Sequence, residues 1–351
     1  MKNRFPPVLL VILLAGCSGT RSGSDLTIAQ GQMPAIATDA SKNIHVVYGT
    51  GDSIMYTWSN DKGRSFAAPV VIDTMSELVD YATRGPQIAI TKNVVTVIAV
   101  NRSGNIFSFV KDESGKWVKT ARVNDADTVD KEGFLGLAGN DENNLFAIWP
   151  DLRDDNHQKI YGARSSDGGK TWSSNILVYR SPDSSICECC KPSVTMDNNN
   201  VYVMFRNWLN GNRDLYLVQS KDGGNRFDSA QKLGTGDWHL NACPMDGGGL
   251  AVSDNGIAQT VWRRHNKIYA ATPGSMEKEI GEGRGCSIEI INGENIYAWT
   301  DSIGNVVCLL PQGTKKTIGN GNLPLLKSLG DNEVICVWSE DKNINSTILR
   351  F

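Results

Sequence analysis

Seven similar segments recur along the chain, and each is a short apolar run that favours a β-strand. Their last residues are 52, 49, 56, 57, 37 and 39 positions apart. Another short apolar run precedes each segment, and most are followed by a third and a fourth. The segments are 44–48, 94–100, 145–149, 201–205, 257–262, 295–299 and 333–338. Four strands per unit at this spacing predict an all-β fold, a β-propeller in which each unit is one blade.

The repeat predicts seven blades, with six as the alternative if one of the two compact late units is incomplete. The blades begin near residues 33, 85, 134, 191, 248, 284 and 322. The last unit has only three strand-like runs, and residues 26–30 are expected to supply its outer strand and close the ring, which removes open sheet edges. Residues 25–351 are therefore expected to form a single domain. The 35 glycines suit the many tight turns of such a fold.

The first residues read as an export signal and not as part of the fold. Lys2 and Arg4 precede an apolar run over residues 8–14, and Leu14-Ala15-Gly16-Cys17 follows. The run is too short to span a bilayer, which takes about 20 apolar residues. The segment resembles the lipobox of bacterial lipoproteins, which implies that residues 1–16 are removed and Cys17 is acylated. A plain signal peptide is the alternative.

A lipidated Cys17 would place the protein in the bacterial cell envelope, with the outer membrane favoured. Residues 17–24, rich in serine and glycine, read as a flexible tether between the lipid and the domain. The membrane would then be contacted through the lipid only. The net charge of −3 and pI near 5.9 argue against nucleic acid as a partner, since phosphate binding needs a concentrated basic surface.

Three units carry a sharper motif between their third and fourth strands. Serine and aspartate can bind turn N–H groups, glycine accepts a positive φ, and the aromatic residue packs against the sheet. The motif resembles the Asp-box, or BNR repeat, of sialidases, in which it is a structural turn. Its residues are Ser59, Asp61, Gly63 and Phe66, then Ser165, Asp167, Gly169 and Trp172, then Ser220, Asp222, Gly224 and Phe227.

The alternation of antiparallel strands predicts that the Asp-box turns lie on one face of the ring. The loops between second and third strands, and those between blades, must then share the other face. This second face is rich in arginine and tryptophan and is where a ligand is expected to bind. Its candidate ligand-binding residues are Arg153, Trp208, Arg213, Trp238, Asp246 and Arg284, although roughly half of such residues are expected to be ordinary solvated loop residues.

The resemblance to sialidases implies three arginines around a substrate carboxylate and an acidic proton donor, with no cofactor. Arg84, Arg206 and Arg263 are the candidate clamp, and Asp151 is the candidate acid. The stretch 31–36 lacks the arginine that opens the first blade in that family, and no nucleophilic tyrosine stands out. The expected function is glycan binding or glycoside hydrolysis. The alternative is a non-enzymatic scaffold for an envelope protein, or a metal or redox module.

The cysteines are the reason for considering a metal or redox module. Cys308 and Cys336 lie in predicted strands, whereas Cys286 and a cluster of four others fall in loops between blades. Outside the cytoplasm, a disulfide from Cys243 to one of Cys187, Cys189 or Cys190 is expected. The competing hypothesis is a soft-metal site for Cu or Zn, with His239 as a further ligand.

Overall fold

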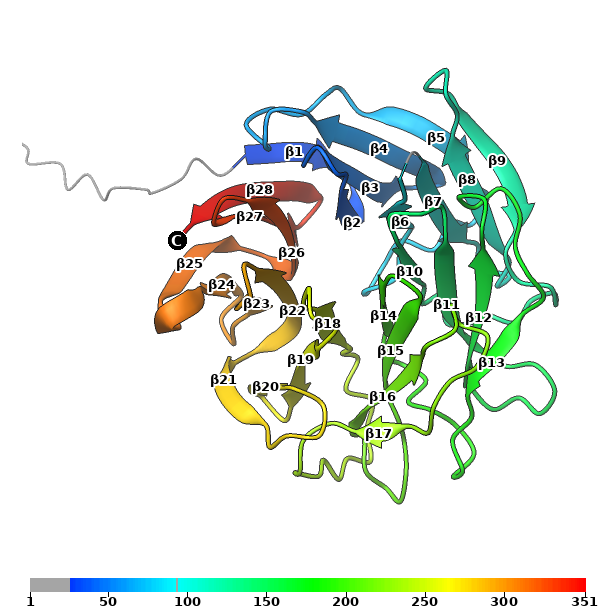
Figure 1. The fold of residues 1–351 in the computed structure, drawn as a ribbon, viewed down its shortest axis with the longest axis vertical. Helices are drawn as coiled ribbons and strands as arrows, with labels where there is room; N and C mark the ends of the chain where they lie inside the picture. The colour runs from blue at the N-terminus through cyan, green and yellow to red at the C-terminus, as the bar shows by residue number, and fades with distance from the viewer. Residues whose placement is uncertain (1–25, 93) are drawn as a thin grey trace, which may run out of the picture.

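Seven four-stranded antiparallel sheets stand around a central axis in the computed structural model, which describes residues 26–92 and 94–351 (Figure 1). In the first six sheets the strands pair in chain order. The first blade is β2 (Gln32–Thr38), β3 (Ile44–Thr50), β4 (Ser53–Ser59) and β5 (Val70–Thr74). The second is β6 (Gln87–Ile90), β7 (Val95–Val100), β8 (Ile106–Lys111) and β9 (Trp117–Arg122). The third is β10 (Gly136–Gly139), β11 (Leu145–Asp151), β12 (Lys159–Ser165) and β13 (Ile176–Tyr179).

The fourth blade is β14 (Ser193–Asp197), β15 (Asn200–Arg206), β16 (Leu215–Ser220) and β17 (Gln231–Lys232). The fifth is β18 (Gly248–Val252), β19 (Ala258–Arg264), β20 (Lys267–Ala271) and β21 (Lys278–Glu282). The sixth is β22 (Arg284–Ile291), β23 (Glu294–Thr300), β24 (Asn305–Leu309) and β25 (Lys315–Asn320), with the 3-10 turn η1 (Pro311–Gly313). The seventh contains β26 (Asn322–Gly330), β27 (Glu333–Glu340) and β28 (Asn343–Arg350).

The N-terminal strand completes the seventh blade. β1 (Leu26–Gln30) pairs antiparallel with β28, so the sheet order is β1-β28-β27-β26. The predicted all-β propeller, its seven blades and its closure by residues 26–30 are confirmed. Both compact late units are full blades, which removes the six-bladed alternative. The signal peptide 1–16, Cys17 and the tether 17–24 lie outside the described residues. In the part of the chain that the structure describes, no helix is long and apolar enough to cross a membrane.

The hydrophobic core lies between blades, not at the centre of the ring. Within residues 26–92 and 94–351, buried apolar side chains form seven clusters, and each cluster joins two neighbouring blades. Trp299 of β23 packs on Gly281 of the fifth blade, and Trp338 of β27 packs on Gly319 of the sixth. Because these glycines have no side chain, the indole rings come close to the neighbouring sheet. The strand-terminal tryptophans of the repeat are therefore contacts between blades.

The Asp-box turns also join neighbouring blades. In the third blade the Ser165 hydroxyl accepts from Gly169 N at 2.8 Å, and Asp167 accepts from Thr171 N at 2.9 Å. Equivalent bonds hold the turns of the first and fourth blades. Gly169 O in turn accepts from Ser108 of the second blade at 2.8 Å. The turn residues therefore hold one blade against the blade before it.

Candidate functional site

Crossovers between blades differ greatly in length around the ring. The fifth-to-sixth and sixth-to-seventh crossovers are single glycines, Gly283 and Gly321, with φ of 140° and 141°. By contrast, four crossovers are 12 to 15 residues long, over residues 75–86, 123–135, 180–192 and 233–247. The last two connect the third blade to the fourth and the fourth blade to the fifth. We call these two segments the long crossovers. They contain seven of the fifteen predicted catalytic, ligand-binding and cysteine-cluster residues, namely Cys187, Cys189, Cys190, Trp238, His239, Cys243 and Asp246.

A disulfide between Cys189 and Cys243 ties the long crossovers together, with their Cα atoms 6.2 Å apart. The predicted bridge from Cys243 to one of three clustered cysteines is therefore confirmed. The other five described cysteines are reduced and buried. Cys308 and Cys336 lie in β24 and β27, as expected. Cys286, expected in a loop, instead lies inside β22, because the crossover before it is a single residue.

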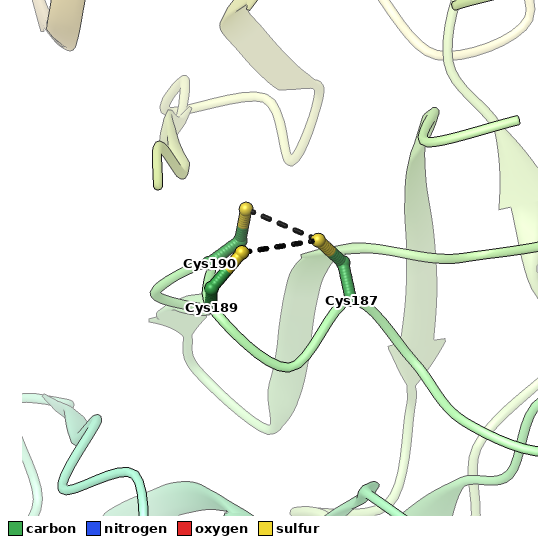
Figure 2. A group of neighbouring side chains, drawn as sticks. All are labelled: Cys187, Cys189 and Cys190. Atoms are coloured by element: carbon green, nitrogen blue, oxygen red, sulfur yellow. Dashed lines mark hydrogen bonds between the residues drawn. The ribbon is translucent and has the colours of Figure 1, made fainter. Parts of the chain in front are cut away.

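Two free thiols lie beside this disulfide. The Cys187 sulfur is 3.3 Å from the Cys190 sulfur and 3.8 Å from the Cys189 sulfur (Figure 2). All three sulfurs lie within 4.8 Å of one another. His239, the histidine among the five predicted metal ligands, is exposed, and its ring packs against Gly211. The structure thus gathers the sulfurs and leaves His239 outside the group.

The charges around the sulfurs favour a thiolate. Arg213 Nη1 donates to Cys187 Sγ at 3.0 Å. The hydrogen bond between Cys187 and Cys190, together with the Arg213 and Arg206 guanidinium groups, lowers the pKa of Cys187 to about 6. Burial raises the pKa of Cys190 well above its usual value, so Cys187 is the sulfur of this pair that ionises first.

The donor set does not fit the Zn(II) site considered from the sequence. A structural zinc site uses four donors, and thiolates must be free to bind. Cys189 is committed to a disulfide, which leaves the thiols of Cys187 and Cys190. The Arg213 guanidinium already faces Cys187 and would repel a second cation at the same sulfur.

The three arginines of the predicted carboxylate clamp all bind protein groups. Arg206 is 1% exposed and donates to the carbonyls of Arg213, Asp246 and Arg263 at 2.7, 3.3 and 3.0 Å. Arg263 contacts the Asp246 carboxylate at 2.6 Å and donates to Pro244 O. Arg84, also buried, pairs with Glu132 at 2.9 Å and lies over the Phe134 ring.

The predicted proton donor is equally engaged. Asp151 is 0% exposed and accepts hydrogen bonds from Trp149 Nε1 at 2.8 Å and from three nitrogens of Arg153 at 2.8–2.9 Å. Arg153 also binds Asp125 and stacks on Tyr161. Asp151 and Arg153 therefore form an internal pair that does not reach a ligand.

Of the other predicted ligand-binding residues, two are buried and two are exposed. Trp238 is 5% exposed and has the guanidinium groups of Arg206 and Arg263 5.0 and 5.3 Å from its ring centre. Asp246 is buried beside Arg263, and burial raises the pKa of its carboxyl. Trp208 is 37% exposed, with Arg213 4.7 Å from its ring centre. Arg284 is exposed at the first residue of β22.

The central channel contains a polar residue that the sequence reasoning did not single out. The channel has a volume of about 270 Å³ and is lined by residues at or near the first strand of every blade. Lys191 enters it and donates to Gln87 Oε1 at 3.0 Å. Burial lowers the pKa of Lys191 to about 8. Lys191 could have been identified from its position just before β14, because the first strand of each blade lines the central channel.

No protein-family model and no curated protein matches the chain. Among solved structures, it is similar to the BP39L lectin from Burkholderia pseudomallei, with 10% identity, a TM-score of 0.66, and coverage of 92% of this chain and 96% of that one. It is also similar to an α-L-arabinanase from Penicillium chrysogenum, with 11% identity, a TM-score of 0.56, and coverage of 94% and 98%. A third similar structure is the α-L-arabinofuranosidase Arb93A from Fusarium graminearum, with 12% identity, a TM-score of 0.55, and coverage of 94% of this chain and 98% of that one. The chain therefore has the β-propeller fold that these proteins share, built here from seven blades.

Proposed function

We propose that this protein is an exported, lipid-anchored propeller that binds glycans on the face formed by its long crossovers. The observation that carries the proposal is Trp208, an exposed indole held by Arg213 at the edge of the disulfide-tied sector. Sugars stack on aromatic faces, and a nearby guanidinium favours acidic sugars or hydroxyl-rich ones. The three neighbours in fold include a lectin, an arabinanase complexed with arabinobiose and an arabinofuranosidase, which is consistent with a glycan ligand.

Binding without hydrolysis is the function that the geometry supports best. Most glycoside hydrolases need a carboxylic acid that can protonate the leaving group and a second group on the other side of the bond. Asp151 is committed to Trp149 and Arg153, and Asp246 to Arg263. A sialidase-type clamp would also need free guanidinium groups, which Arg84, Arg206 and Arg263 do not offer.

A glycan array probed with the folded domain, followed by titration of the best ligand, tests the proposal. Trp208→Ala should weaken binding about 10-fold or more, as loss of a central aromatic contact does. Met276→Ala is the matched control, because Met276 is 77% exposed and lies between β20 and β21 on the opposite face. Absence of binding across the array, or equal affinities of the two variants, would refute glycan binding through Trp208.

Hydrolysis is tested in parallel with fluorogenic sialosides and α-L-arabinofuranosides. The expected result is no turnover above a blank. Turnover that Asp151→Asn abolishes would instead make the protein a glycosidase. The lipid anchor is tested separately, by metabolic labelling with a fatty acid in a bacterial host. Labelling that persists in Cys17→Ser, or that is absent from the wild type, would contradict the anchor.

A further inference from the structure

The four clustered cysteines of the long crossovers form two pairs at different depths. The disulfide lies at the surface, because Cys243 is exposed and Cys189 is half-buried. The two thiols lie behind it, with Cys187 1% and Cys190 2% exposed. Cys187 is the sulfur between the pairs, 3.3 Å from Cys190 and 3.8 Å from Cys189 (Figure 2). A disulfide that serves only as a structural tie does not need a dithiol beside it.

We propose that these four cysteines form a thiol–disulfide exchange centre, in which the buried Cys187/Cys190 dithiol reduces the Cys189–Cys243 disulfide from inside the protein. This activity goes beyond glycan binding and does not depend on it. Exchange proceeds by attack of a thiolate on a disulfide sulfur, so it requires an attacking sulfur within reach of the bond. Cys187 has that position relative to Cys189.

Two steps complete the reaction without an outside oxidant. In the first, the Cys187 thiolate bonds to Cys189 Sγ, the Cys189–Cys243 bond breaks, and its electron pair leaves on Cys243, which takes a proton from water. In the second, Cys190 bonds to Cys187 Sγ, the Cys187–Cys189 bond breaks, and the Cys190 proton passes to the departing Cys189 sulfur. Two electrons have then moved from the inner pair to the outer pair. The product has a Cys187–Cys190 disulfide and thiols at Cys189 and Cys243.

The surroundings of Cys187 suit the attacking sulfur. Arg213 Nη1 lies 3.0 Å from it, and Cys187 N donates to Arg206 O at 3.0 Å, which fixes the loop against the end of β15. The positive charge stabilises a thiolate, the reactive form of cysteine. The same charge opposes a bound metal cation, so the arrangement favours exchange chemistry over the soft-metal site.

The exchange links the buried pair to thiols and disulfides in solution. Low-molecular-weight thiols and disulfides can reach the sulfur of exposed Cys243, whereas the buried inner pair is screened from them. Formation of the inner disulfide also releases the bond between the long crossovers, residues 180–192 and 233–247. The centre therefore couples the redox state of the surroundings to the connection between these two segments.

The experiment equilibrates the folded domain in glutathione buffers of increasing oxidising power, quenches with acid, and alkylates free thiols before mass-spectrometric mapping. Molecules with a single disulfide should be a mixture of the Cys189–Cys243 and Cys187–Cys190 forms, the second with Cys243 alkylated. The Cys190→Ser variant should lose the second form and accumulate a Cys187–Cys189 bond. Cys308→Ala is the matched control and should leave the wild-type distribution unchanged, since Cys308 is buried in the sixth blade.

The wild-type measurement is decisive even if the Cys190→Ser variant does not fold. If single-disulfide molecules contain only the Cys189–Cys243 bond, with Cys187 and Cys190 both alkylated at every buffer ratio, the bond is a structural disulfide that does not exchange with the neighbouring thiols. The proposal is then wrong. The measurement uses glutathione and no glycan, so its failure would leave the glycan proposal standing, and a failed glycan array would leave this one standing.

Discussion

Gly224, in the Asp-box turn of the fourth blade, lies against the third blade in a backbone conformation that side chains disfavour. Its φ is +86°, and a Cβ there would lie 2.5 Å from Cδ2 of Phe146 and closer still to Cε2. Phe146 is 0% exposed and packs on Phe227 at 5.6 Å between ring centres. The ring therefore has little room to move. Gly224→Ala should act on the interface between the two blades.

The expected cost has two parts. The left-handed conformation costs an alanine about 1–2 kcal/mol, of which the less flexible unfolded chain offsets about 0.4–1 kcal/mol. Overpacking against a rigid ring costs about 1–3 kcal/mol more. Gly304→Ala isolates the first part, because Gly304 has a φ of +89° and an added Cβ would meet no atom within 4 Å. The free energy of unfolding should therefore fall by about 1 kcal/mol for Gly304→Ala and by about 2–4 kcal/mol for Gly224→Ala.

Urea unfolding followed by tryptophan fluorescence measures both variants. Adding Phe146→Leu to Gly224→Ala should recover part of the loss, since the smaller side chain relieves the overlap, and a double-mutant cycle would record the coupling. Equal losses for the two glycine variants would show that the turn is not pressed against the third blade. The account of Asp-box turns as contacts between blades would then be wrong.

Three further predictions concern the ligand face. Arg206→Met removes the hydrogen-bond donor of three carbonyls, one buried and two half-buried, and should lower the free energy of unfolding by about 3–5 kcal/mol in a denaturation experiment. The exposed control Arg284→Met should change it by no more than about 0.5 kcal/mol, and similar losses for the two variants would put Arg206 outside the core. Burial raises the pKa of Asp80 to about 6, so folding stability falls as pH rises from about 4 to above 6. Asp80→Asn should remove that pH dependence and should stabilise the protein at pH 7 by roughly 1 kcal/mol, a figure reduced for the partial exposure of Asp80. A pH profile of stability that is the same in the variant and the wild type would contradict this prediction. Arg213→Gln should raise the pKa of Cys187 from about 6, seen as a shift of the thiolate absorbance titration to higher pH. The stability that the Cys187 thiolate contributes is present above pH 9 and is lost as pH falls through 6. The difference in free energy of unfolding between wild type and Arg213→Gln should therefore shrink as pH falls over that range. A difference that stays constant with pH would refute the charge interaction between Arg213 and Cys187.

The blade repeat could be predicted because its signals are local. The bonds of an Asp-box join residues within a few positions of one another, as in Ser165, Asp167 and Gly169. Strand patterns likewise depend on neighbours in sequence. Even the closing strand, residues 26–30, was identifiable, since the last unit lacked one strand and an open edge is unfavourable.

The roles of the charged residues could not be predicted in the same way. Arg206, Arg263 and Asp151 looked available because each stands near the end of a second strand, where loops face solvent. Whether such a side chain reaches solvent depends on what covers it. Arg206 is covered by carbonyls up to 57 positions away, which no local pattern encodes.

The architecture could be predicted from local patterns, because strand periodicity, turn chemistry and repeat number are properties of short segments that add up to one closed ring. The chemistry of the ligand face became clear only from the packed blades. Their packing selected Cys189 from three candidates as the partner of Cys243, placed Cys187 between that bond and Cys190, and set Arg213 against it. A disulfide or an ion pair depends on distances of a few ångströms between loops of different blades, and those distances are fixed only when the blades pack.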